Sequence, residues 1–189
     1  MQVISSILNL QTAYVEDEGV LDILRESQNR IKSMAIIHEK LYRTKDFSLI
    51  KFSEYVQHLS QNLVDTYELS STDIKLNYNL DEVFLNIDSA IPCGLIINEL
   101  ISNSLKYAFV NKSNGVIFID LHQNSNEVTL RIGDNGIGFP NDIDYKNTDS
   151  LGLQLVNTLV EQLEGNITLD NSRGATFTIK FKIKDSKDV

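Results

Sequence analysis

Three short stretches of the sequence combine residue types that could hold and transfer a phosphate group. In the first, Glu99, Asn103 and Lys106 stand at helical positions i, i+4 and i+7, so their side chains share one face. An amide oxygen is a hard ligand that suits Mg²⁺, and lysine neutralises phosphate charge. The spacing fits a magnesium-bound polyphosphate, and it also fits the solvated face of an ordinary amphipathic helix.

The second stretch runs from Asp134 to Phe139 and follows a predicted strand. The Asp134 carboxylate could accept a hydrogen bond from an exocyclic amine such as that of adenine. Gly136 and Gly138 flank Ile137 and indicate either backbone freedom or close approach of a ligand. The alternative is a strand-ending turn that is rich in turn-forming residues.

The third stretch is Ser150-Leu151-Gly152-Leu153-Gln154, where a long loop meets a predicted helix. The free backbone N–H groups at a helix N-terminus bind phosphate oxygens. A serine cap followed by a tolerated glycine explains the same residues without any ligand. None of the three stretches decides the function alone.

Hydrophobic periodicity predicts the helices that surround these stretches. Apolar residues recur at helical spacing over 3–14 and, as a heptad-like seam, over 20–41, which is typical of a helical hairpin. Beyond a linker at 44–51, a helix with Ser53 as its N-cap is expected to run to residue 67. A long helix should begin with Asp88 or Ser89 as its cap and end near Phe109, and a last one should span 155–163 and end at Gly165.

Alternating hydrophobicity predicts the strands. A strand over 74–80 is expected to pair with a short strand over 83–87, and a hairpin joins 117–121 to 128–132. Two further strands are predicted over 167–169 and 177–183. This order of elements favours an α+β fold, in which a helical hairpin precedes a two-layer α/β sandwich with helices on one face of a mixed sheet.

The composition argues against several other classes of protein. Seventeen Lys and Arg against 26 Asp and Glu give the 189 residues a net charge of −9, which disfavours nucleic acid as the main partner. Three His and one Cys leave little material for a zinc site or a Cys/His catalytic pair. No apolar run approaches the ~20 residues of a membrane-spanning helix. The glycine spacings match neither a P-loop nor a dinucleotide-binding fingerprint.

Taken in order, the motifs resemble the Bergerat-type ATP-binding domain shared by histidine kinases, gyrase B, Hsp90 and MutL, over about residues 53–185. The resemblance rests on Asn98-Glu99-x-x-x-Asn103-x-x-Lys106-Tyr107, Asp134-x-Gly136-x-Gly138-Phe139, Leu151-Gly152-Leu153 and Gly174-Ala175-Thr176-Phe177. The front of the chain is similar to the dimerisation hairpin of one histidine-kinase subfamily. There, a run like 2–10 precedes a helix resembling Arg30-Ile31-x-x-Met34-x-x-Ile37-His38-x-x-Leu41-Tyr42.

The resemblance implies a role for each matching residue. Glu99 would be catalytic, orienting or deprotonating the attacking nucleophile, and Asn103 would bind Mg²⁺ through the phosphates. Asp134 would accept the adenine amino group while Thr176 holds a water beside it, and residues 139–150 would form a mobile ATP lid. The remaining nucleotide-binding residues that it implies are Lys106, Tyr107, Gly136, Ile137, Gly138, Leu151, Gly152 and Leu153.

The phosphoacceptor is the point where this chain departs from the resembling subfamily. The usual acceptor histidine lies just upstream of the run at 2–10, so the expectation is that none is present here and that autophosphorylation of this chain is doubtful. His38 on the apolar seam is the alternative acceptor, and its competing interpretation is a core or interface histidine. We therefore expect a hairpin over 1–46, without its acceptor portion, and a catalytic domain over 47–189.

The implied protein is the transmitter region of a cytoplasmic sensor histidine kinase that uses ATP and Mg²⁺. It would dimerise through residues 2–43 and pass the phosphoryl group to an Asp of a response-regulator receiver domain, with no nucleic acid and no membrane segment involved. Two alternatives remain open. One is a dimeric signalling scaffold that binds nucleotide without transferring phosphate, and the other is an anti-sigma-type serine/threonine kinase.

Overall fold

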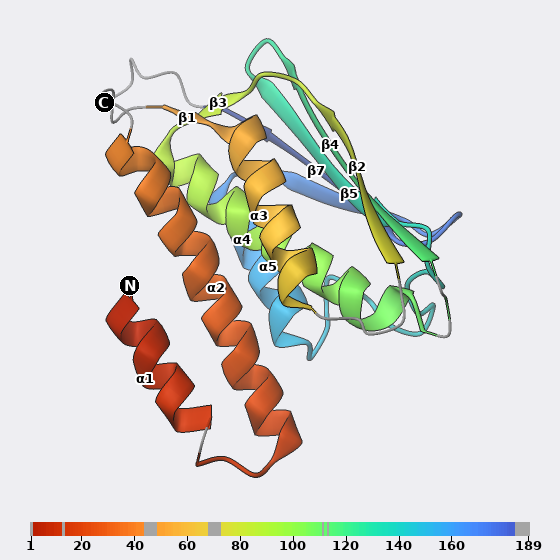
Figure 1. Ribbon diagram of the computed structural model, residues 1–189. Coiled ribbons are helices and arrows are strands. Elements are labelled where there is room, and N and C mark those ends of the chain that lie inside the picture. Colours follow the sequence, from red (N-terminus) through yellow and green to blue (C-terminus); the bar gives the residue numbers. More distant parts are fainter. Residues whose placement is uncertain are drawn as a thin grey trace.

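The computed structural model describes residues 2–12, 14–43, 49–67, 73–110, 112 and 114–183. The chain begins with a helical hairpin of α1 (Gln2–Thr12) and α2 (Glu18–Arg43). The turn before α2 is stabilised by the Asp17 carboxylate, which accepts hydrogen bonds from the backbone N–H groups of Gly19 (2.8 Å) and Val20 (3.1 Å). Figure 1 shows α2 lying against the rest of the molecule, with α1 on its outer side.

A mixed five-stranded sheet forms the second part of the molecule. Its strand order is β2-β4-β5-β7-β6, and only the β2–β4 pair is parallel. The strands are β2 (Asp73–Leu80), β4 (Asn114–Asn124), β5 (Glu127–Asp134), β6 (Asn166–Asp170) and β7 (Thr176–Lys182). One face carries α3 (Phe52–Thr66), α4 (Ile87–Asn103) and α5 (Leu151–Gln162), as Figure 1 shows. The predicted two-layer arrangement with a mixed sheet is confirmed.

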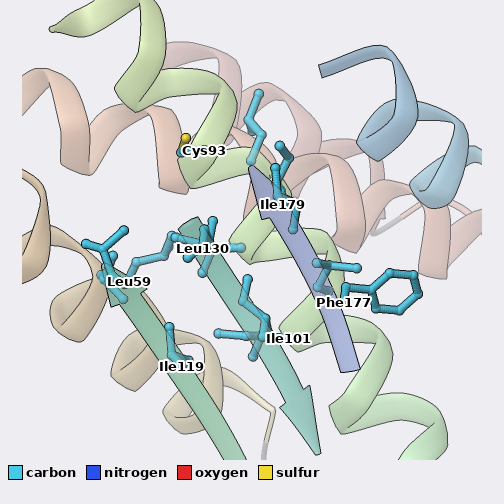
Figure 2. Packing of buried hydrophobic residues seen from close by; sticks show 14 of the residues in the cluster. Leu59, Cys93, Ile101, Ile119, Leu130, Phe177 and Ile179 are labelled. Atoms are coloured by element: carbon cyan, nitrogen blue, oxygen red, sulfur yellow. The ribbon is translucent and has the colours of Figure 1, made fainter. Parts of the chain in front are cut away.

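The core lies between this sheet and its helices (Figure 2). Every second residue of β4, namely Ile117, Ile119 and Leu121, is fully buried, which is the period-2 pattern of a strand with one covered face. Ile101 of α4 and Ile179 of β7 are also fully buried in the same cluster. Burying a side chain of this size contributes about 1.5–3 kcal/mol, so these contacts stabilise the layer that carries the site.

The prediction that 83–87 pairs with 74–80 is wrong. The short strand β3 (Phe84–Leu85) instead pairs antiparallel with β1 (Ile50–Lys51), while β2 pairs with β4. The apolar side chains of Ile50 and Leu85 are both buried in this small ladder, so the alternation in the sequence was real although its partner was misassigned. Lys51 and Ile50 also belonged to the predicted linker, of which residues 44–48 lie outside the described part.

Helix starts also differ from the sequence prediction. α3 begins at Phe52, with Lys51 rather than Ser53 at the N-cap, because the Phe52 N–H bonds to Val83 O (2.8 Å) and β1 leads directly into the helix. α4 is capped by Asn86, whose side chain accepts a hydrogen bond from Ser89 N (3.0 Å). α5 begins at Leu151, so Ser150 stands at the N-cap as the third stretch predicted, although its side chain makes no capping hydrogen bond; the apolar period alone, over 155–163, gave a later start.

The long helix does not continue as an α-helix to Phe109. After Asn103 it passes into a π-helical turn, η1 (Ser104–Ala108). Such turns are rare and frequently mark functional sites. This one buries the side chains of Ser104 and Ala108 against the end of β5, where the Ala108 carbonyl accepts a hydrogen bond from Ile137 N (3.0 Å). The turn therefore places the end of the helix over the second sequence motif.

Candidate nucleotide-binding site

A largely apolar cavity of about 450 Å³ opens between the end of α4, the C-terminal end of β5, the start of β7 and the loop before α5. Six residues with an implied nucleotide-binding role line it together: Asn103, Tyr107, Asp134, Ile137, Gly138 and Leu153. Its size is in the range of cavities that hold a small molecule. The cavity thus brings together six residues that are up to 50 positions apart in the sequence.

Asp134 is the buried carboxylate of this cavity, with 2% of its surface exposed. Its Oδ2 accepts a hydrogen bond from Ser104 Oγ (2.7 Å), and its Oδ1 accepts from Gly136 N (2.9 Å) and Ala175 N (3.4 Å). These donors compensate the removal of the charge from water and fix the orientation of the carboxylate. A fixed acceptor in an apolar cavity selects a ligand that presents an N–H donor.

Two glycines provide backbone conformations that the cavity wall requires. Gly174 has φ +93°, and a Cβ at this position would lie 2.0 Å from the Asp134 carbonyl oxygen. Gly138 has φ +85°, and a Cβ there would lie 2.7 Å from Asn171 Oδ1. Both φ values fall in the region that favours glycine. The glycines flanking the motifs therefore serve close packing and not only turn formation.

The loop over 139–150 covers the cavity and contributes Pro140, Ile143 and Thr148 to its lining. Asn171 holds the start of this loop, because its side chain accepts a hydrogen bond from Phe139 N (2.6 Å) and donates one to Phe139 O (2.6 Å). A backbone hydrogen bond from Lys146 is the main cause that lowers the pKa of Asp144 at the loop surface. These contacts give the loop an ordered path over the cavity.

A second, more polar cavity of about 210 Å³ adjoins the first and shares Asn103, Tyr107 and Ser150 with it. Glu99, Leu151 and Gly152 also line it. Gly152 allows close packing here, since a Cβ at this residue would lie 2.7 Å from Glu99 Oε2. The first turn of α5, with its unpaired backbone N–H groups, therefore meets the Glu99 carboxylate at this cavity.

Glu99 is paired with a residue of the helical hairpin. Arg30 Nε lies 2.7 Å from Glu99 Oε1 and Arg30 Nη2 lies 2.8 Å from Glu99 Oε2, which is a bidentate ion pair. Asn98 Nδ2 also donates to Glu99 Oε1 (3.1 Å). The Glu99 side chain is 6% exposed and that of Arg30 is 20% exposed, so the pair is shielded from solvent.

Three predicted site residues take other places. Lys106 is half-buried in η1 and does not line either of the two cavities, whereas its neighbour Tyr107 lines both. Because η1 is π-helical, residues after Asn103 no longer follow the 3.6-residue period on which the i, i+7 expectation was based. Gly136 packs against the Ala108 carbonyl, and Thr176 is buried opposite Gly133 in the β5–β7 ladder.

Sequence reasoning gave no role to three residues of the site. Ser104 orients Asp134, Arg30 pairs with Glu99, and Phe177 lines the first cavity. The order of motifs contained Phe177 and Arg30 without assigning them a contact. Ser104 directly follows Asn103, but only the π-helical turn directs its hydroxyl toward β5.

His38 lies in α2, and its side chain is outside the described part of the chain.

Asn103 is the residue that could bring an amide oxygen to a metal at the junction of the cavities. Among the residues that the structure describes, no three His, Cys, Asp or Glu side chains cluster to hold a metal ion. The described helices include none that is long and apolar enough to cross a membrane.

Comparison with known proteins identifies the family. Residues 88–185 match the family described as histidine kinase-, DNA gyrase B-, and HSP90-like ATPase, and residues 1–67 match the family described as histidine kinase. The sensor histidine kinase PdtaS of Mycobacterium tuberculosis is 26% identical over 175 residues, which are 92% of this chain and 34% of the relative. The blue-light-activated histidine kinase 2 of Erythrobacter litoralis is 33% identical over 107 residues, 56% of this chain and 30% of the relative. This chain thus spans about a third of the length of these relatives.

Solved structures show the same fold over nearly the whole chain. The histidine kinase domain of the Erythrobacter litoralis blue-light-activated kinase EL346 superposes with a TM-score of 0.76 at 19% identity, covering 95% of this chain and 94% of that chain. Acinetobacter baumannii histidine kinase AdeS gives a TM-score of 0.61 at 20% identity and covers 95% of each chain. The hairpin, the sheet and the helical layer are all included. The chain belongs to the histidine kinase-, DNA gyrase B- and HSP90-like ATPase family, in its histidine-kinase form.

Proposed function

We propose that this chain is the ATP-binding transmitter region of a sensor histidine kinase. The observation that carries the proposal is the buried Asp134 carboxylate, held by three donors in a cavity that is otherwise largely apolar. An adenine ring fills such a cavity, and its amino group donates to the carboxylate. The triphosphate then extends toward the polar second cavity and the N-terminus of α5.

At the phosphate end of the site, Asn103 and Glu99 have different proposed roles. Asn103 would hold Mg²⁺ together with phosphate oxygens, and the ion supplies charge neutralisation for the transferred group. The unpartnered hydroxyl of Ser102, which lines this cavity, adds a polar group suited to hydrated magnesium or to phosphate. Glu99 orients the acceptor imidazole and takes its proton through a carboxylate oxygen. The proposed nucleotide set is completed by Lys106, Tyr107, Gly136, Ile137, Gly138, Leu151, Gly152, Leu153 and Thr176.

The proposal extends to the partners of the chain. The phosphoryl group passes to a histidine and then to an Asp of a response-regulator receiver domain, in the cytoplasm where ATP and such regulators meet. The hairpin exposes Ile7 (53%), Leu10 (65%) and Tyr14 (85%), and such an apolar surface favours homodimerisation through residues 2–43. Domain limits of 1–46 and 47–189 remain part of this proposal.

Titration of ATP–Mg²⁺ into wild-type protein and Asp134→Asn tests the nucleotide assignment. The substitution replaces an acceptor by a donor where the adenine amino group donates, so the Kd should rise roughly 10- to 100-fold. Glu161→Gln removes one negative charge from the exposed surface of α5 and is the matched control, with an unchanged Kd. Equal affinity of wild type and Asp134→Asn, or no binding by either, contradicts the proposal.

A further inference from the structure

We propose that Arg30 is an inhibitory latch through which the helical hairpin controls the phosphate end of the site. In the structure, α2 holds the Glu99 carboxylate in the bidentate ion pair and forms part of the wall of the second cavity. An acceptor imidazole then reaches Glu99 only after α2 moves and the pair opens. This inference rests on the proposed function, because it concerns the step that follows ATP binding.

The hydrogen bonds of Glu99 are the first support. Both carboxylate oxygens accept from the Arg30 guanidinium, and Oε1 accepts a further hydrogen bond from Asn98. A carboxylate offers about four lone-pair sites, so three are already used. The guanidinium lies against both oxygens, so an imidazole that approaches Glu99 competes with Arg30 for the carboxylate.

The wall of the second cavity is the second support. Ile23 of α2 lines it beside Glu99 and Gly152, and Ile23 stands seven residues before Arg30 on the same face of the helix. Ser102 lines the same cavity; the residue is 7% exposed, and its buried Oγ has no hydrogen-bond partner among the described residues. The cavity therefore combines a hydroxyl suited to a polar ligand with an apolar side chain of the hairpin in its wall.

The position of α1 is the third support. Figure 1 shows α1 on the outer side of α2, so that α2 separates it from α4 and α5. No residue of α1 lines the second cavity, as far as the described residues show. An acceptor histidine on the outer helix would therefore reach the second cavity only after the hairpin has moved relative to the catalytic layer.

The first cavity is independent of the hairpin, which makes the latch testable. The described residues that line it all fall between Leu100 and Phe177, and none of them belongs to α2. Opening the latch should therefore change turnover without changing ATP affinity. A residue that only maintains the fold changes both or lowers turnover.

The experiment measures ATP–Mg²⁺ affinity and the steady-state release of phosphate from γ-labelled ATP, with water as the acceptor, for wild type, Arg30→Gln, Arg30→Lys and Arg25→Gln. Arg30→Gln should raise kcat about tenfold at unchanged Kd, which corresponds to about 1.4 kcal/mol in the closed–open equilibrium. Arg30→Lys keeps the charge but loses the fork, so a smaller increase is expected. Arg25→Gln removes the same charge from an exposed position of α2 and should leave kcat unchanged.

An unchanged or lower kcat in Arg30→Gln at unchanged Kd overturns the latch, and a lower kcat would make Arg30 a residue that positions Glu99 for catalysis. Arg30→Lys decides the question if Arg30→Gln fails to fold, because the latch requires its kcat to exceed the wild-type value. If wild-type protein fails to bind ATP–Mg²⁺, the proposed function itself is wrong. If it binds and no Arg30 variant turns over faster, only the latch is wrong.

Discussion

The two cavities of the site lie side by side but are built differently. The first is largely apolar, its described lining residues all belong to the catalytic layer, and its carboxylate is oriented by Ser104 and backbone N–H groups. The second is polar and takes part of its wall, and the partner of its carboxylate, from α2. Our two proposals therefore assign nucleotide recognition to the catalytic layer and control of the phosphate end to the hairpin. They predict that a movement of the hairpin changes phosphate transfer without changing ATP affinity.

Among the substitutions that test this difference between the two cavities, Glu99→Gln should have the largest effect. The variant keeps the shape of the side chain but removes the base, so kcat for phosphate release should fall about 10²–10⁴-fold while the Kd for ATP changes little. Combining it with Arg30→Gln sharpens the comparison, because releasing a base that is absent should give no increase in kcat. A large loss of ATP affinity in Glu99→Gln would show that the two cavities are not separable.

The pH dependence of stability is the next largest effect, and it belongs to the catalytic layer alone. Burial raises the pKa of the Cys93 thiol above its ordinary value of 9.0, and burial together with the nearby Cys93 raises that of Tyr55 above 10.0. The folded state therefore keeps two protons that the unfolded state loses, that of Cys93 above about pH 9 and that of Tyr55 above about pH 10. The contribution of these two groups to the free energy of unfolding is therefore fully present below pH 9. Above pH 9 the free energy of unfolding should fall by up to about 1.4 kcal/mol per pH unit per group.

Urea unfolding between pH 7.5 and 10 measures this slope. Cys93→Ala should remove the part of the slope that begins near pH 9, and Arg25→Gln in the hairpin should leave the slope unchanged. A free energy of unfolding that stays constant or rises above pH 9 would show that neither group keeps its proton in the folded protein.

The smallest effects come from two neighbouring serines that serve different cavities. Ser104→Ala removes the donor to Asp134 Oδ2 and should weaken ATP binding roughly tenfold, the effect of one hydrogen bond to a charged group. Ser102→Ala removes a hydroxyl that lines only the second cavity and should change ATP affinity less than about threefold. Calorimetric titration compares the two, and equal losses of affinity would contradict the assignment of each serine to its own cavity.

Local signals in the sequence predicted the β4–β5 hairpin and the helices around it. They also singled out residues that the structure brings together in the first cavity. They failed where tertiary contacts decide the outcome. The strand at 84–85 pairs with 50–51 because both bury an apolar residue beside α3, a contact that alternation alone cannot reveal. Lys106 lines neither cavity and Ser104 contacts Asp134, because η1 departs from the helical period on which the spacing argument was based. Arg30 meets Glu99 across 69 residues of sequence, which no local pattern encodes.

The Asn171 side chain has a mechanical consequence for the loop over the first cavity. By donating to Phe139 O and accepting from Phe139 N, it makes the two hydrogen bonds that a neighbouring strand would make. Asn157 Nδ2 anchors the same loop at Tyr145 O (2.7 Å). The loop is thereby divided into two short arcs with fixed pivots, and short arcs lose little chain entropy when they close. If residues 139–150 close over a ligand as proposed for an ATP lid, we expect two short hinged segments to move instead of one long flexible loop.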